Sequence, residues 1–133
     1  MIVRDRFWWT LVTIGCLSVA IGLAQLLVPA LVLALVATEA SSLSLHLIAS
    51  LGLLVALFSG MFLYAIMDER PQHVAVLWTG FQKLGTAAAV GLGVQHAAYV
   101  APVVAFALFD LVAGIMILGY WYRVRQHHSE SME

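Results

Sequence analysis

The chain has 133 residues, of which 63% are hydrophobic and only 10% are charged. A soluble domain carries about 25% charged residues, so this sequence has too few polar groups for a water-facing surface, and we expect the lipid bilayer to be its solvent. The formal net charge of −1, without a polybasic run, excludes nucleic acid as an expected partner. A bilayer core needs about 20 apolar residues per helix, so the chain has room for four spans in a single membrane domain.

The first apolar segment runs from Phe7 to Val36. As one helix it would be about 45 Å long, which exceeds the bilayer core, so the segment must tilt, kink or break. Pro29 is the natural place, because proline removes a backbone donor and clashes with the preceding turn. We therefore expect a span over about 7–28, broken or kinked at Pro29. A short apolar helix over 29–36 then lies at the interface or on the bundle.

Three further apolar segments follow, separated by polar connections. The second span is expected over about 43–67 and ends in a charged, proline-containing turn at 68–71. The third is expected over about 73–94 and the fourth over about 99–122, with a short connection between them. The sequence thus predicts an all-α polytopic membrane protein, an antiparallel bundle of four transmembrane helices, with residues 123–133 as a polar cytoplasmic tail.

Basic residues near the span ends predict the orientation of this bundle. The expected loops 37–42 and 95–98, on one side, contain no Lys or Arg. The other side carries five arginines, namely Arg4, Arg6, Arg70, Arg123 and Arg125. Cytoplasmic flanks of membrane proteins carry the excess of Lys and Arg, so we expect both termini in the cytoplasm.

Lys83 and Asp110 are the only ionisable residues expected in the middle of the spans. Lys83 lies 13 positions after Arg70, and Asp110 lies 13 positions before Arg123. At 1.5 Å per residue, both lie about 20 Å from the same side of the bundle. Burying a lone charge in hydrocarbon costs at least about 2.5 kcal/mol, so we expect the two side chains to form an intramembrane ion pair.

Small residues accompany this pair on the same helix faces, and they predict close packing of the third and fourth spans. They are Gly80, Ala87, Gly91, Ala107 and Gly114. Two roles for the pair remain open at this stage. It is either a structural pin that sets the register of two helices or a proton- or substrate-binding group in a transport pathway. Few polar residues are available to line such a pathway, which counts against transport.

Two histidines and one amide are further candidates for ligand binding. His46 and His96 are both expected near the non-cytoplasmic face, where they could serve haem b or a quinone. Gln25, near the outer end of the first span, is expected to form an interhelical hydrogen bond more than to bind a ligand. Cys16 is the single cysteine, and no residue spacing typical of a metal site or of an enzyme occurs. We therefore expect no metal and no catalytic activity.

Four short motifs stand out: Gly60-x-x-x-Tyr64, Asp68-Glu69-Arg70-Pro71, Gly80-x-x-Lys83 and Asp110-Leu111-Val112-x-Gly114. Together they resemble the small four-helix bacterial inner-membrane proteins grouped as DoxX-like, over nearly the whole chain. The resemblance implies that Lys83 and Asp110 belong to a family pattern, with a glycine–lysine motif in the third span and an acidic or amide residue in the fourth. Some members of that group are linked to redox or quinone-associated complexes.

These observations favour a non-catalytic integral membrane protein, a subunit or accessory component of a homo-oligomer or of a larger membrane complex. Its expected partners are the lipid bilayer and other membrane proteins, including copies of itself. One alternative is a small proton-coupled transporter or channel that uses Asp110 and Lys83. Another is a haem- or quinone-binding redox protein that uses His46 and His96.

Overall fold

The structure, a computed structural model, describes residues 4–37, 39–70, 72–96 and 101–130. The fold is all-α, as the composition predicts. Within the described residues the helices are α1 (Arg6–Leu27), α2 (Pro29–Val36), α3 (Ser42–Met67), α4 (His73–Gln95) and α5 (Val103–Glu130).

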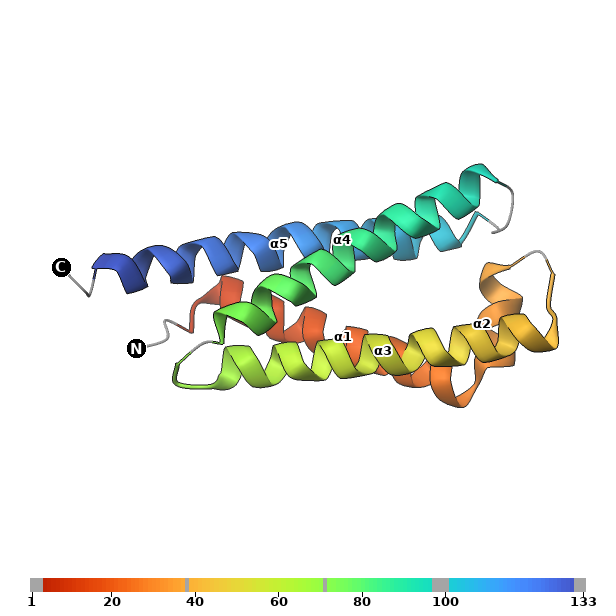
Figure 1. Cartoon of the computed structure of the whole chain (residues 1–133), viewed down its shortest axis with the longest axis horizontal. Coiled ribbons are helices and arrows are strands. Elements are labelled where there is room, and N and C mark those ends of the chain that lie inside the picture. The colour runs from red at the N-terminus through yellow and green to blue at the C-terminus, as the bar shows by residue number, and fades with distance from the viewer. Residues whose placement is uncertain (1–3, 38, 71, 97–100, 131–133) are drawn as a thin grey trace.

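The break between α1 and α2 lies at Val28, whose backbone leaves the helical region with φ −131° and ψ 54°. A residue that precedes proline is pushed out of the helical conformation by the proline ring. Pro29 itself then occupies the first position of α2, where no backbone donor is needed. The predicted break is therefore confirmed, and α2 folds back against α3 (Figure 1).

Polar side chains cap the starts of α1 and α3. Asp5 caps α1 by accepting a hydrogen bond from the Trp8 amide at 2.8 Å. Ser41 and Ser44 form a reciprocal capping box at the start of α3, which satisfies backbone donors that the helix leaves unpaired. The predicted turn at 68–71 is seen as bends at 68–70, whereas Pro71 lies outside the described residues.

The helix α5 continues to Glu130, beyond the end at residue 122 that the sequence predicts. No glycine or proline occurs between Tyr122 and Glu130, and Arg, Gln and Glu are good helix formers. The first part of the polar tail therefore extends the last helix. The predicted start of that span at residue 99 lies outside the described residues.

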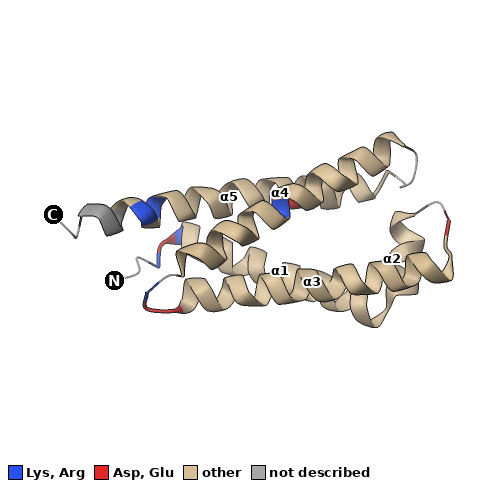
Figure 2. Cartoon of the chain, in the orientation of Figure 1, with Lys and Arg blue, Asp and Glu red and all other residues tan. Residues whose placement is uncertain are grey.

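The helices form two antiparallel pairs, α1 with α3 and α4 with α5, which contact each other less extensively (Figure 1). The main apolar core lies where the first turns of α1, the last turns of α3, the first turns of α4 and the second half of α5 come together. It consists of Trp8, Leu11, Phe62, Ala65, Ile66, Val76, Ile117 and Tyr120. We call this end the arginine-rich end, because Arg4, Arg6, Arg70, Arg123 and Arg125 all lie there. Figure 2 shows that charged residues gather there, and Figure 1 shows the pairs separating toward the opposite, far end.

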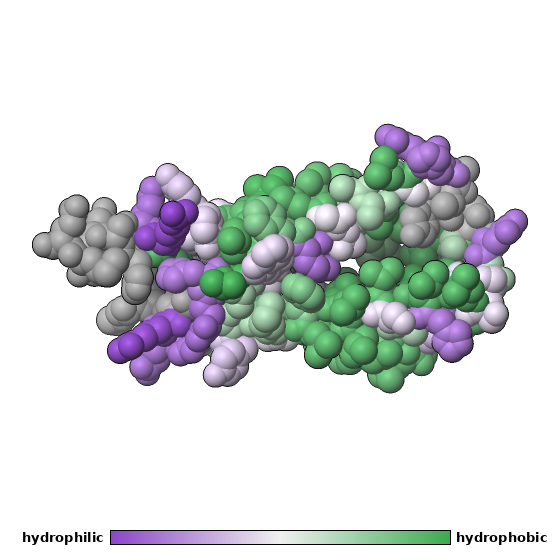
Figure 3. All heavy atoms as spheres, viewed as in Figure 1, coloured by the Kyte–Doolittle hydropathy of each residue, from purple (hydrophilic) through white to green (hydrophobic). Residues whose placement is uncertain are grey.

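Three helical segments of the described chain are long and apolar enough to cross a membrane: α1, α3 and Val103–Gln126 of α5. The long helix α4 is not among them, because Lys83 and several small or polar residues lower its hydropathy. This criterion therefore finds three apolar spans and not the four that the sequence predicts. Apolar side chains cover the middle of the visible face, with hydrophilic ones at both ends (Figure 3). The chain is a helical membrane protein.

Candidate functional site

The candidate site is a pair of charged side chains where α4 packs on α5. The Lys83 Nζ lies 2.7 Å from Asp110 Oδ1, within both hydrogen-bond and salt-bridge distance. In Figure 2 this pair is the blue segment in α4 and the red segment next to it in α5, far from the charges at the ends. No other salt bridge occurs among the residues that the structure describes.

The two members of the pair differ in accessibility. The Lys83 side chain is 3% exposed, whereas that of Asp110 is 15% exposed. The Lys83 ammonium also lies 5.5 Å from the centre of the Phe109 ring, so its charge is shared between a carboxylate and an aromatic face. The carboxylate is consequently the member of the pair that a proton or a ligand reaches more easily.

Buried hydroxyl groups occur on α4, one turn from the pair, and on α1 and α3. Thr79, one turn before Lys83, donates a hydrogen bond to the Ala75 carbonyl at 2.8 Å, and its hydroxyl lies 3.5 Å from the Phe58 carbonyl on α3. Ser18 of α1 and Ser59 of α3 are each 1% exposed, and neither hydroxyl has a hydrogen-bond partner among the residues that the structure describes. The interior at this level is therefore more polar than the hydropathy of α1 and α3 suggests.

Two of the predicted small residues make the contact between α4 and α5 possible. A Cβ atom added at Gly80 would lie 2.6 Å from Leu118 Cδ2, and one added at Gly114 would lie 2.8 Å from Leu84 Cδ2. These leucines occupy the space that larger side chains would need, so the helix axes stay close enough for the ion pair to form.

The remaining small residues contribute less than the sequence predicts. Ala87 and Ala107 are half-buried, but a Cβ added at Gly91 would meet nothing within 4 Å. The expectation that Gly91 takes part in close packing is therefore wrong. Crossing helices are closest only near the crossing point, and Gly91 lies three turns beyond Gly80 on α4.

A closer helix contact, which the sequence did not single out as a site, joins α1 to α3. A Cβ at Gly22 would lie 2.6 Å from the Ala56 amide nitrogen, and one at Gly52 would lie 2.6 Å from the Gly22 carbonyl oxygen. Here backbone meets backbone. The sequence of α1 does carry a signal for this contact: Gly15 and Gly22 are seven residues apart and therefore share a helix face.

The three ligand candidates lie apart from the ion pair. His46 and His96 are exposed, and the His96 Nδ1 lies 2.8 Å from the carbonyl oxygen of Leu92 on its own helix. Gln25 Oε1 is buried without a hydrogen-bond partner among the described residues, so this atom does not form the interhelical bond expected of it. No group of three or more His, Cys, Asp or Glu in the described part of the chain could hold a metal ion.

The fold and this site define the class of protein, a helical membrane protein with one internal ion pair. Comparison with protein-family models, with curated proteins and with solved structures yields no match. The resemblance to DoxX-like proteins stays a prediction, as does a role for His46 and His96 in binding haem b or a quinone.

Proposed function

We propose that the chain spans the membrane four times, with α4 as the additional transmembrane helix. The proposal is supported by the antiparallel packing of α4 along α5 (Figure 1). A helix that packs lengthwise on a spanning helix shares its depth in the bilayer, and its 23 residues suffice to cross the core. Lys83 and Asp110 then lie near the middle of the bilayer, where pairing offsets part of the cost of burying each charge.

Four spans return the C-terminus to the side of the membrane that holds the N-terminus. The arginines at that end then face the cytoplasm, because Lys and Arg are enriched on cytoplasmic flanks. The opposite end carries Glu39 as its charged residue among those described. The expected setting is a bacterial inner membrane, in line with the DoxX-like resemblance.

Within this membrane we assign the chain a non-catalytic role, as a subunit or accessory component of a homo-oligomer or of a larger membrane complex. The observation that carries this assignment is the uneven packing of the two helix pairs. They share an apolar core at the arginine-rich end and separate toward the far end. Association of membrane helices is driven by side-chain packing, and exposed apolar side chains toward the far end, such as Leu47 and Leu92, are available to pack against a further helix.

The test is purification from native membranes in a mild detergent, followed by native mass spectrometry and an absorption spectrum of the same fraction. A defined heteromeric or homo-oligomeric species supports the subunit role. A colourless monomer argues against both this role and haem binding. A Soret band would indicate bound haem b and would support His46 and His96 as its ligands.

A second candidate function, a proton-coupled transporter, is favoured by the greater exposure of the Asp110 carboxylate. A carboxylate in a transport pathway must reach water in at least one state. The test is proton flux into proteoliposomes that contain a pH-sensitive dye. Transport predicts a flux that Asp110→Asn abolishes, while the exposed turn variant Glu69→Gln retains it. Flux that is equal in protein-free liposomes excludes this candidate.

A further inference from the structure

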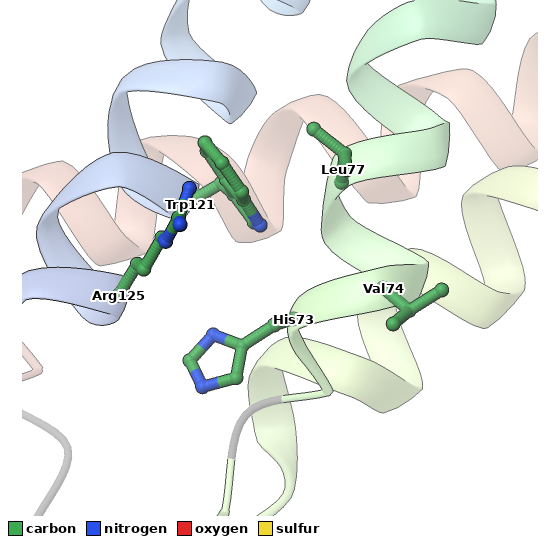
Figure 4. Close-up of a pocket in the computed structure, with 5 residues that line it drawn as sticks. All are labelled: His73, Val74, Leu77, Trp121 and Arg125. Atoms are coloured by element: carbon green, nitrogen blue, oxygen red, sulfur yellow. The ribbon is translucent and has the colours of Figure 1, made fainter. Parts of the chain in front are cut away.

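A shallow pocket of about 290 Å³ lies between α4 and α5 at the arginine-rich end. His73, Val74 and Leu77 line it from the first turns of α4, and Trp121 and Arg125 line it from α5 (Figure 4). Figure 4 shows Leu77 directed toward Trp121 and the His73 ring directed toward α5. This volume is near the lower limit for cavities that take small ligands.

The surface of this pocket is almost wholly apolar, and the Arg125 guanidinium lies at its edge. Val74, Leu77 and the Trp121 ring provide the apolar part. On the rim, the Arg125 guanidinium carbon lies 5.2 Å from the centre of the Trp121 ring. This exposed arginine is thus positioned by an aromatic face, and it forms no salt bridge with any residue that the structure describes.

We propose that this pocket binds one anionic phospholipid of the surrounding bilayer. The lipid phosphate lies against Arg125, and the upper part of one acyl chain follows Val74, Leu77 and Trp121. A planar guanidinium is well suited to bind phosphate through paired hydrogen bonds. Basic pockets between transmembrane helices on the cytoplasmic side are suited to anionic headgroups.

The charge and the depth of the pocket both favour a lipid as the occupant. Among the described residues, those that line the pocket include Arg125 and no Asp or Glu. Tryptophan is enriched at the membrane–water interface, so a pocket lined by Trp121 lies where lipid phosphates meet acyl chains. The inference goes beyond the proposed function but rests on its membrane arrangement, in which α4 spans the bilayer and the arginine-rich end faces the cytoplasm.

The experiment is native mass spectrometry of the purified chain in mixed micelles of phosphatidylglycerol and phosphatidylcholine with identical acyl chains. The expected result is preferential retention of one phosphatidylglycerol. Arg125→Gln should reduce this retention about tenfold, because it removes the charged partner of the phosphate. Arg123→Gln is the matched control: it removes the same charge two residues away, from a side chain that lies over Phe7 and does not line the pocket.

Two further arms separate a lipid site from a general attraction for anions. Leu77→Trp changes no charge and should block retention by filling the space beside Trp121, toward which Leu77 is directed (Figure 4). An excess of inorganic phosphate should leave the bound lipid in place, because free phosphate makes no acyl-chain contact. Equal retention of both lipids, equal losses in the two arginine variants, or displacement by inorganic phosphate would each overturn the proposal.

Discussion

The two helix pairs of this bundle, α1 with α3 and α4 with α5, are held together by different contacts. In the first pair the backbones touch at Gly22 and Gly52, and no charged group lies between the helices. In the second pair glycines face leucine side chains, and the pairing is completed by the salt bridge between Lys83 and Asp110. Both pairs are antiparallel and of similar length.

The difference shows how hydropathy relates to helix pairing in this protein. The contact between α1 and α3 is formed mainly by glycines and apolar side chains, so these helices associate chiefly through close van der Waals contact, with one hydrogen bond from Trp8 Nε1 to the Ile66 carbonyl. The helix α4 is less apolar, and its lysine requires a partner of opposite charge. We therefore expect the stability of the second pair to depend on the charges of Lys83 and Asp110. The stability of the first pair should depend on side-chain size at the glycine contact. This distinction leads to four predictions.

The largest expected effect is the loss of one member of the ion pair. Lys83→Met or Asp110→Leu leaves the other charge buried and unpaired, which should reduce the free energy of unfolding by about 3–5 kcal/mol. The double variant should lose less than the sum of the two single losses. Denaturant titration in detergent micelles measures all three values. Additive losses would show that the two charges do not stabilise each other.

The next largest effect is expected at the backbone contact of the first pair. Gly22→Val places a Cβ atom within 2.7 Å of the Ala56 nitrogen and the Gly52 oxygen, neither of which can rotate away. We expect a loss of about 1–3 kcal/mol. Gly60→Ala, on α3 in open space, is the control and should gain up to about 1 kcal/mol from helix propensity. Thermal unfolding in micelles compares the variants, and equal behaviour would refute the close contact.

A smaller loss is expected from the corresponding change in the second pair. Gly80→Ala meets the Cδ2 and Cγ atoms of Leu118, and a leucine side chain can change its rotamer, so the loss should be about 1 kcal/mol. The same thermal unfolding assay measures it. A loss as large as that of Gly22→Val would mean that the two contacts are equally rigid, which contradicts the distinction drawn between the pairs.

The smallest effect concerns the buried hydroxyls of Ser59 and Thr79. Ser59→Ala removes a buried Oγ that has no hydrogen-bond partner, so stability should stay unchanged or rise by about 1 kcal/mol. Thr79→Val is the matched change at a satisfied hydroxyl, since it deletes the hydrogen bond to the Ala75 carbonyl, and should lose about 1 kcal/mol. If Ser59→Ala is as costly as Thr79→Val, the Ser59 hydroxyl has a partner in the membrane.

Several of these features follow from residues close together in the sequence. The helix break follows from the steric exclusion of Val28 by Pro29, and the start of α3 follows from the capping residues Ser41 and Ser44. The equal spacing of Lys83 and Asp110 from flanking arginines predicts that they lie at one level, because the helical rise is constant. Such inferences succeed because their causes act within a few residues or along one helix.

Other features depended on how the helices cross. Gly91 shares a face with Gly80 yet lies in open space, and Gln25 Oε1 is buried without the partner expected of it. The pocket beneath Arg125 forms only because the first turns of α4 meet the last turns of α5. By itself the sequence determined the all-α membrane class, the break at Pro29 and the level of the two charges, since hydropathy, proline geometry and helical rise are local. Only the tertiary structure decided which glycines pack, which polar atoms are satisfied and where α4 meets α5. Those outcomes depend on crossing angles between segments distant in the chain.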